Sequence, residues 1–265
     1  MLQKSSLILI FILIFGFHLK AFAQEGAAEG ESLGGLPKLS IGLYEENYIF
    51  PFYRSTPNPL DTNQSNELKY QFSIKFTPFT WGNWSYILAY SQKSFWQIYS
   101  GDTSRPFRET NYNPETLFRW KSGGLYWDLG YEHESNGESD PVSRSWDRAF
   151  TRFGIVTPRF KTSLKLWYII VGELNGPDFL ERKSPKRDYM GNFEFDIGAM
   201  LGTIMVKGLA RYNPDTGYGY GQGMLMWRFY GALLFGFTYS RGYGDSLRSY
   251  QINHETYGVG FLMNP

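Results

Sequence analysis

The sequence consists largely of runs of about ten residues in which bulky apolar side chains alternate with polar ones. In the clearest run, residues 67–76, every second residue is Leu, Tyr, Phe or Ile, and Glu, Lys, Gln and Ser lie between them. Successive side chains of a β-strand point to opposite faces, so this pattern predicts strands with one apolar face. Turn-forming residues separate the runs, and no helical period is sustained. We therefore expect an all-β chain of antiparallel strands.

Twelve ranges match the pattern well enough to be predicted as strands. They cover residues 39–53, 67–76, 84–92, 108–120, 125–135, 145–155, 162–172, 189–197, 204–212, 218–229, 233–240 and 257–261. Pro51 weakens the first range, because proline has no backbone N–H to donate to a neighbouring strand. An even number of antiparallel strands is typical of single-chain bacterial barrels that cross the outer membrane.

The N-terminus has the features of a secretory signal peptide. An apolar run extends from Leu7 to Phe17, and Ala21-Phe22-Ala23 forms a small-x-small cleavage site. The run is too short for a membrane-spanning helix. The following residues are small, Gly-rich and acidic, as in a flexible leader. We expect a signal peptide over residues 1–23, a leader over 24–38 and one β domain over 39–265.

The alternation alone fits two architectures. A transmembrane barrel has its apolar face outside, whereas a soluble sandwich or lipocalin-like barrel has it inside. Aromatic residues make up 19% of the chain, far more than a soluble domain needs, and membrane barrels use them in interfacial girdles. Together with the signal peptide, this content predicts a twelve-stranded transmembrane β-barrel of the outer membrane. Its lumen would contain salt bridges and hydrogen bonds, or a narrow water channel.

Charge and cysteine content argue against a nucleic-acid-binding protein and against a disulfide-stabilised one. The formal net charge of +1 argues against nucleic acid as a partner. The chain has no cysteine, so no disulfide contributes, although export would permit one.

Two polar residues continue the apolar face of residues 125–135. His133 and Ser135 follow four bulky apolar residues on that face, and Asp147 lies on the corresponding face of the next run. A histidine can take the proton of a serine hydroxyl, and an acid that accepts its other ring N–H fixes the tautomer. The three residues are therefore candidates for a catalytic triad. In the alternative interpretation, His133 and Ser135 only cap a strand at the level of the lipid headgroups.

Several motifs resemble outer-membrane phospholipase A. They are His133-x-Ser135-Asn136-Gly137, Ser143-Arg144-Ser145-Trp146-x-Arg148, Tyr90-Ser91-Gln92-Lys93-Ser94, residues 106–112, residues 213–219 and Tyr243-Gly244-Asp245-Ser246-Leu247. They extend over most of residues 40–264. The resemblance implies a twelve-stranded outer-membrane barrel that hydrolyses acyl esters of phospholipids, with calcium bound and two chains paired. It favours the catalytic interpretation over the capping one.

Roles are implied at the positions that match. Ser135 would be the nucleophile and His133 the general base, and Gly137 would donate its backbone N–H to an oxyanion hole. The third member of the triad is an asparagine in this family, and this sequence has Asp147 there.

The resemblance also implies a calcium site shared between two chains. Ser143 matches a calcium-binding serine, Glu138 matches a residue that provides its backbone carbonyl, and Ser104 matches a ligand from the partner chain. The family has arginine where this chain has Glu138, a change that a backbone ligand tolerates. Gln92 matches a residue that hydrogen-bonds across the dimer, and the alternative is that it simply faces lipid headgroups.

The sequence thus predicts a calcium-dependent phospholipase A that cleaves acyl esters of glycerophospholipids and lysophospholipids. It would act as a homodimer in the outer membrane of a Gram-negative cell. The alternatives are a passive pore or structural barrel with a degenerate site, and a lipopolysaccharide deacylase. Acyl position, head-group preference and dimer affinity are left open.

Overall fold

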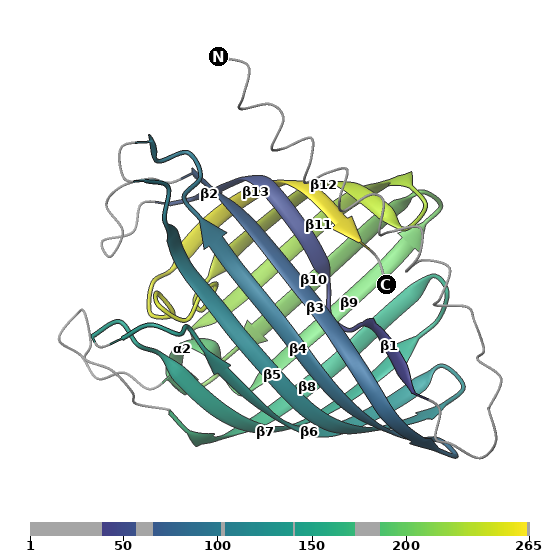
Figure 1. Cartoon of the computed structure of the whole chain (residues 1–265). Helices are drawn as coiled ribbons and strands as arrows, with labels where there is room; N and C mark the ends of the chain where they lie inside the picture. The colour runs from purple at the N-terminus through teal and green to yellow at the C-terminus, as the bar shows by residue number, and fades with distance from the viewer. Residues whose placement is uncertain (1–38, 57–65, 102–103, 140, 173–185, 264–265) are drawn as a thin grey trace.

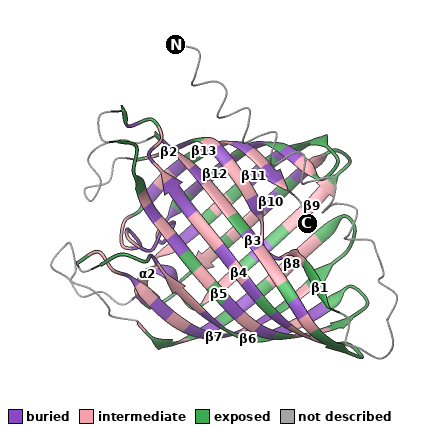
Figure 2. Cartoon of the chain, in the orientation of Figure 1, coloured by how far each residue is buried: buried purple, intermediate pink, exposed green. Residues whose placement is uncertain are grey.

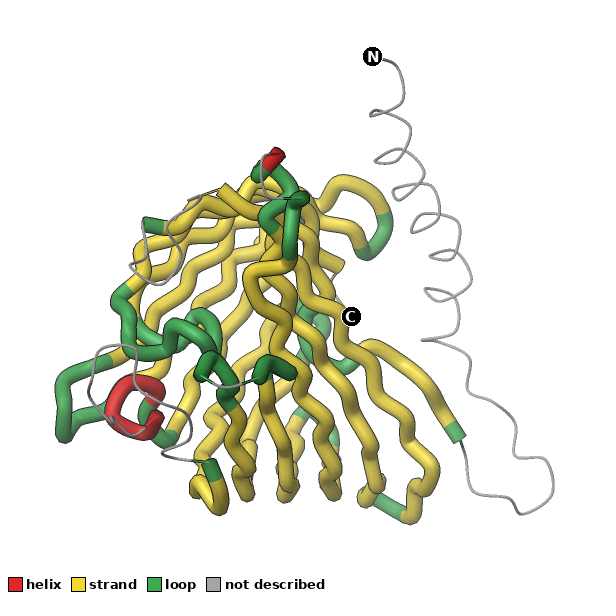
Figure 3. Tube along the Cα trace, turned by 60° about the vertical axis from the view of Figure 1, so that its left-hand side comes forward, coloured by secondary structure: helices red, strands yellow, loops and turns green. Residues whose placement is uncertain are grey.

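A computed structural model describes residues 39–56, 66–101, 104–139, 141–172 and 186–263 of the chain. The predicted signal peptide and the predicted leader, residues 1–38, lie outside the described residues. The strands are β1 (Ser40–Leu43), β2 (Asn47–Ser55), β3 (Asn66–Trp81), β4 (Trp84–Trp96), β5 (Phe107–Ser122), β6 (Leu125–Ser135), β7 (Ser145–Val156), β8 (Phe160–Val171), β9 (Phe193–Leu201), β10 (Ile204–Tyr212), β11 (Gly219–Tyr230), β12 (Leu233–Gly242) and β13 (His254–Met263). All pairings are antiparallel, and β3 pairs with β4 to close the sheet into a barrel (Figures 1 and 3).

The first wall position of the barrel is shared by two short strands. Both β1 and β2 pair with β3, at residues 74–77 and 66–71 respectively. Residues 44–46 connect them, so the thirteen described strands form twelve wall positions and the predicted twelve-stranded barrel is confirmed. Pro51 lies where the pairing of β2 is irregular on both sides, which is where a strand tolerates proline.

One predicted strand begins later than expected. Tyr189 was included in a strand over residues 189–197, but Lys186–Met190 form the short helix α2 and β9 starts at Phe193. Lys186 and Met190 are both buried, and residues four apart share one face of a helix. Met190 packs against Trp146, Leu247 and Tyr250, so tertiary contacts decide the local structure here.

The barrel has its apolar residues outside. On β6, Leu125 and Leu129 are 51% and 54% exposed, whereas Asp128 and Glu132 are 0% and 1% exposed. The same alternation of exposed and buried residues runs along the strands of the whole wall (Figure 2). A soluble barrel would have the reverse pattern, so the transmembrane prediction is confirmed. Among the described residues, no helix is long and apolar enough to cross a bilayer.

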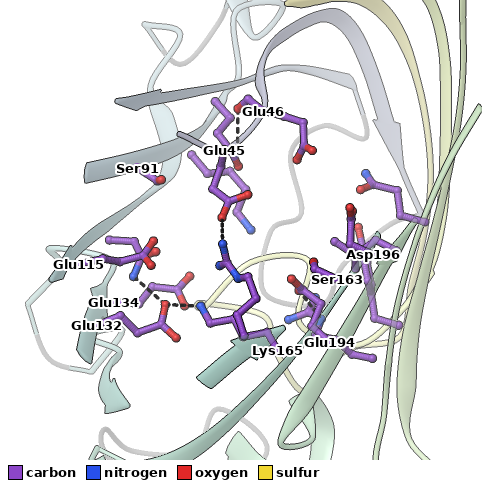
Figure 4. Close-up of a pocket in the computed structure, with 18 of the residues that line it drawn as sticks. Glu45, Glu46, Ser91, Glu115, Glu132, Glu134, Ser163, Lys165, Glu194 and Asp196 are labelled. Atoms are coloured by element: carbon purple, nitrogen blue, oxygen red, sulfur yellow. Dashed lines mark hydrogen bonds and ion pairs between the residues drawn. The ribbon is translucent and has the colours of Figure 1, made fainter. Parts of the chain in front are cut away.

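Ion pairs cross the lumen, as the charged inner faces predicted. Residues 44–46 leave the wall and place two glutamates inside, where Glu45 pairs with Arg152 of β7 at 2.8 Å and Glu46 pairs with Lys207 of β10 (Figure 4). On the wall itself, Lys165 lies 2.8 Å from Glu132. Buried charges need such partners, because an unpaired charge in a low-dielectric interior is costly.

The loop between β12 and β13 is tied to the wall by buried polar contacts. Asp245 accepts hydrogen bonds from Lys69 at 2.7 Å and from Tyr53 at 2.9 Å. Arg248 donates its backbone N–H to Glu109 at 2.7 Å. Burial alone would raise the pKa of Asp245, but Lys69 and Lys93 outweigh burial and hold the pKa well below its usual value.

We expect Asp245→Asn to lower the free energy of unfolding by about 3 kcal/mol, because Lys69 is left buried without its counter-charge. The side chain of Lys69 is only 3% exposed. The depressed pKa of Asp245 means that its stabilisation is present above the unfolded-state pKa of about 4 and is lost as the pH falls below it. Urea unfolding in lipid vesicles at several pH values measures both effects. Asp215→Asn, at an exposed loop carboxylate, is the control, and equal stability of the two variants would contradict the expectation.

Candidate active site

His133 and Asp147 meet on the outer surface of the barrel. They are opposite one another in the pairing of β6 with β7, and His133 Nδ1 lies 2.7 Å from Asp147 Oδ1. Their side chains are 38% and 20% exposed. The structure therefore brings together the acid and base that the sequence placed one hairpin apart, in the arrangement that fixes a histidine tautomer.

Ser135 follows on the same outward face as His133. Its Cα lies opposite Tyr112 of β5 and Ser145 of β7, so the serine sits where β6 ends and β7 begins, beside β5. No hydrogen bond joins the Ser135 hydroxyl to His133 in the described part of the chain. Catalytic hydrogen bonds are often long before substrate binds, so this geometry leaves Ser135 as a candidate nucleophile.

Asn136 closes the loop that follows Ser135. The side chain is buried, and its Oδ1 accepts the backbone N–H groups of Arg144 at 2.9 Å and Glu138 at 3.4 Å. Its Nδ2 donates to the carbonyl of Val142 at 2.8 Å. Loop positions are precise only when such contacts hold them, so Asn136 sets the path of the loop. The motif contained this residue, but sequence reasoning assigned it no role.

Gly137 has a backbone conformation and a contact that both require glycine. Its φ is +65°, and an added Cβ would lie 2.8 Å from the ring of Tyr112. Any other residue would be strained here and would also collide with that ring. Gly137 is an exposed residue two positions after Ser135, so its backbone N–H is a candidate oxyanion donor.

Buried charges hold the two site strands together from the lumen side. Glu134 Oε2 accepts from Trp146 Nε1 and from Arg148 Nη2, each at 2.9 Å, and the guanidinium of Arg148 lies 3.8 Å from the Trp146 ring centre. These residues alternate with His133 and Asp147, so the contacts lie directly behind the site. They fix the register that brings the acid and the histidine together.

A tyrosine adds a contact that sequence reasoning missed. The Tyr131 hydroxyl donates to Asp147 Oδ1 at 2.8 Å, the oxygen that also contacts His133. In the sequence Tyr131 was only the last bulky member of an apolar face.

The family model described as Phospholipase A1 matches residues 30–263. The chain belongs to the phospholipase A1 family.

Sequence relatives agree with this family membership. The chain is 34% identical over 226 residues to the phospholipase A1 of Salmonella typhimurium, a match that covers 79% of this chain and 74% of the relative. It is 32% identical over 245 residues to the phospholipase A1 of Escherichia coli (strain K12), covering 83% and 80% respectively. The resemblance drawn from the motifs is thereby confirmed.

Solved structures of family members share the fold. The outer membrane phospholipase A from Escherichia coli superposes with a TM-score of 0.74 at 29% identity, covering 85% of this chain and 98% of that one. The Salmonella typhi outer membrane phospholipase dimer with bound calcium gives a TM-score of 0.74 at 30% identity, covering 85% and 92%.

The residues predicted to bind calcium offer oxygen donors only. Ser143 and Glu138 both belong to the loop that Asn136 closes, and Ser104 lies in a different loop with a φ of +59°. No group of three or more His, Cys, Asp or Glu side chains suited to a metal lies among the described residues. Hydroxyl, backbone carbonyl and carboxylate oxygens are the ligands that calcium prefers, so this donor set fits that ion.

Gln92 is part of a chain of polar groups on the outer face of β4. Tyr90 donates to its Oε1 at 3.0 Å, and its Nε2 donates to Ser94 at 3.3 Å. Cα pairing places Gln92 opposite Tyr112, which is in turn opposite Ser135. The candidate dimer-contact residue is thus two strands from the candidate nucleophile.

Proposed function

We propose that this protein is an outer-membrane phospholipase A that hydrolyses acyl ester bonds of glycerophospholipids and lysophospholipids. The observation that carries the proposal is the His133–Asp147 contact on the lipid-facing surface of a barrel of the phospholipase A1 family. Serine hydrolases rely on such an acid–histidine contact, and here it lies beside a serine on the same face.

The proposed chemistry uses three side chains and one backbone group. Ser135 attacks the ester carbonyl while His133 takes its proton, and Asp147 accepts the ring N–H and stabilises the imidazolium. The Gly137 N–H donates to the oxyanion that forms on the carbonyl oxygen. His133 then returns the proton to the leaving alcohol, and the acyl-serine is hydrolysed by water in the same way.

Calcium is the proposed cofactor, because the donor set suits it and a family structure contains it. Ser143 and the carbonyl of Glu138 would hold the ion in one chain, and Ser104 would contribute from the other. A bound divalent cation adds positive charge where the oxyanion develops. The carboxylate of Glu138, where the family has arginine, would offer the ion a further oxygen ligand.

Position in the membrane explains both access and control. Substrate lipids reach an outward-facing site by lateral diffusion, without leaving the bilayer. An outer leaflet of lipopolysaccharide contains few phospholipids, so the site has little substrate while the membrane is intact. A requirement for two chains adds a second restraint, and we propose that the active form is a homodimer with Gln92 at its interface. Residues 1–23 are proposed to be removed during export.

The deciding experiment is an assay of the purified protein on mixed phospholipid micelles, with lipids labelled in one acyl chain at a time. Release of fatty acid supports the proposal and identifies the acyl position. Conductance across a planar bilayer without fatty-acid release supports a passive pore instead. Release from lipopolysaccharide but not from phospholipid supports a lipopolysaccharide deacylase.

Two substitutions of Asp147 separate its role as a hydrogen-bond acceptor from the role of its negative charge. We expect Asp147→Asn to keep activity within about tenfold, roughly 1.4 kcal/mol of barrier, because an amide oxygen still accepts the ring N–H. Asp147→Ala should lose considerably more, since no acceptor remains for either His133 or Tyr131. Initial rates at saturating calcium and several pH values measure both. Equal damage from Asn and Ala would mean that the carboxylate itself is essential.

A further inference from the structure

We propose that Tyr131 is a positioning residue of the active site, whose hydroxyl holds the Asp147 carboxylate in the orientation that accepts the ring N–H of His133. This inference rests on the proposed function. Its geometric basis is one shared atom: Asp147 Oδ1 lies 2.8 Å from the Tyr131 hydroxyl and 2.7 Å from His133 Nδ1.

The strand pairing explains how the tyrosine reaches the acid. Tyr131 is opposite Ala149, and Asp147 is two residues from Ala149 on the same face of β7. Diagonal neighbours across antiparallel strands lie within reach of an aromatic side chain. The small side chain of Ala149 leaves the space between the phenol and the carboxylate open.

A second hydrogen-bond donor restricts the rotation of the Asp147 carboxylate. A carboxylate has two acceptor oxygens and no donor, so a single contact leaves it free to turn about its last side-chain bond. Donors on two sides of one oxygen restrict that rotation. On the lipid-facing surface they also replace the water that would otherwise solvate the charge.

The other charged side chains of β6 and β7 do not contact Asp147. On the outward face, the neighbours from the adjoining strands are Tyr112 of β5 and Val171 of β8, which lies opposite Asp147. Glu132, Glu134 and Arg148 belong to the lumen side of the same two strands. Tyr131 and His133 are therefore the only described side chains that donate to Asp147.

The competing explanation is that Tyr131 is simply an aromatic residue of the interfacial girdle. The chain contains a matched example of that role. Tyr239 of β12 is 42% exposed, like Tyr131, and donates to the carboxylate of Glu255 at 3.0 Å. That pair lies on a different part of the wall, and the side chain of the adjacent His254 hydrogen-bonds to Ser249 instead. Tyr239→Phe thus removes an equivalent bond away from the site.

The test compares Tyr131→Phe with Tyr239→Phe in the full-length protein on phospholipid micelles. We expect Tyr131→Phe to lower kcat about tenfold with KM within about twofold, because the ring and the substrate surface are kept while the orienting bond is lost. Its acid limb in the pH–rate profile should move to higher pH, since a carboxylate with one donor fewer favours the protonated imidazole. Tyr239→Phe should change neither.

A double-mutant cycle distinguishes positioning from packing. In an Asp147→Ala background Tyr131→Phe should cost nothing further, because its acceptor is gone, whereas a packing role would cost the same in both backgrounds. Incorporation of 3-fluorotyrosine at position 131 keeps the ring and strengthens the donor, and it should move the acid limb to lower pH. This second replacement gives a result even if Tyr131→Phe folds poorly.

Wild-type activity in Tyr131→Phe, or an equal loss in the Asp147→Ala background, would overturn the inference. Neither result affects the proposed function, which fails if the parent protein releases no fatty acid from phospholipid. A fully active Ser135→Ala would instead remove the proposed role of Ser135, whatever Tyr131→Phe does.

Discussion

Ser135→Ala is expected to fold as the parent barrel does and to lose about 10³-fold or more of its esterase rate, about 4 kcal/mol of barrier. The substitution removes only the hydroxyl group, from which His133 would take a proton. The residual rate would come from binding and from the Gly137 N–H, as in triads that lack their nucleophile. The rate of fatty-acid release from micelles measures the effect.

The change should leave folding intact, because Ser135 makes no side-chain hydrogen bond in the described structure and β6 is held by its pairing with β5 and β7. Heat-modifiable mobility on gels checks that the barrel has formed. Ser163→Ala, which removes a hydroxyl from the lumen wall, is the matched control and should leave the rate unchanged. Undiminished hydrolysis by Ser135→Ala would rule out Ser135 as the nucleophile.

The strand pattern predicted most of the wall because lipid and lumen impose opposite demands on alternate residues. Residues 125–135 match β6 at both ends, and the alternation is clear from Leu125 to Tyr131. The interruption at residues 44–46 was not predictable in the same way. Two adjacent glutamates are expected in a surface loop, and only the cations Arg152 and Lys207 on distant strands explain why they lie inside.

The site was predictable to the extent that it broke the apolar pattern. His133 and Ser135 were noticed because polar residues are unusual on a lipid-facing strand, and their hairpin brought Asp147 opposite. Tyr131 obeyed the pattern and so gave no signal, because a phenol has an apolar ring and a polar tip. The role of Asn136 was not predicted, because its side chain acts through hydrogen bonds across its loop and residue spacing in the sequence does not reveal them.

Removal of calcium should abolish activity and separate the chains. If Ser143 and Glu138 of one chain and Ser104 of the other hold one ion, calcium binds the paired state better and shifts the equilibrium towards it. A strong chelator should therefore lower both the rate of hydrolysis and the dimer fraction found by sedimentation in detergent. Activity that survives the chelator in a protein that stays monomeric would rule this site out.

Two serines of one loop make the calcium prediction specific. Ser143→Ala should raise the calcium concentration for half-maximal activity by about tenfold or more, a size typical for losing a group that supports a metal. Ser139 is an exposed serine in the same loop, and Ser139→Ala should leave that concentration unchanged. Because Asn136 holds the loop through backbone groups of Glu138, Val142 and Arg144, neither serine is needed for its path. A difference between the two variants thus reports on the ion, and equal behaviour would place the calcium elsewhere.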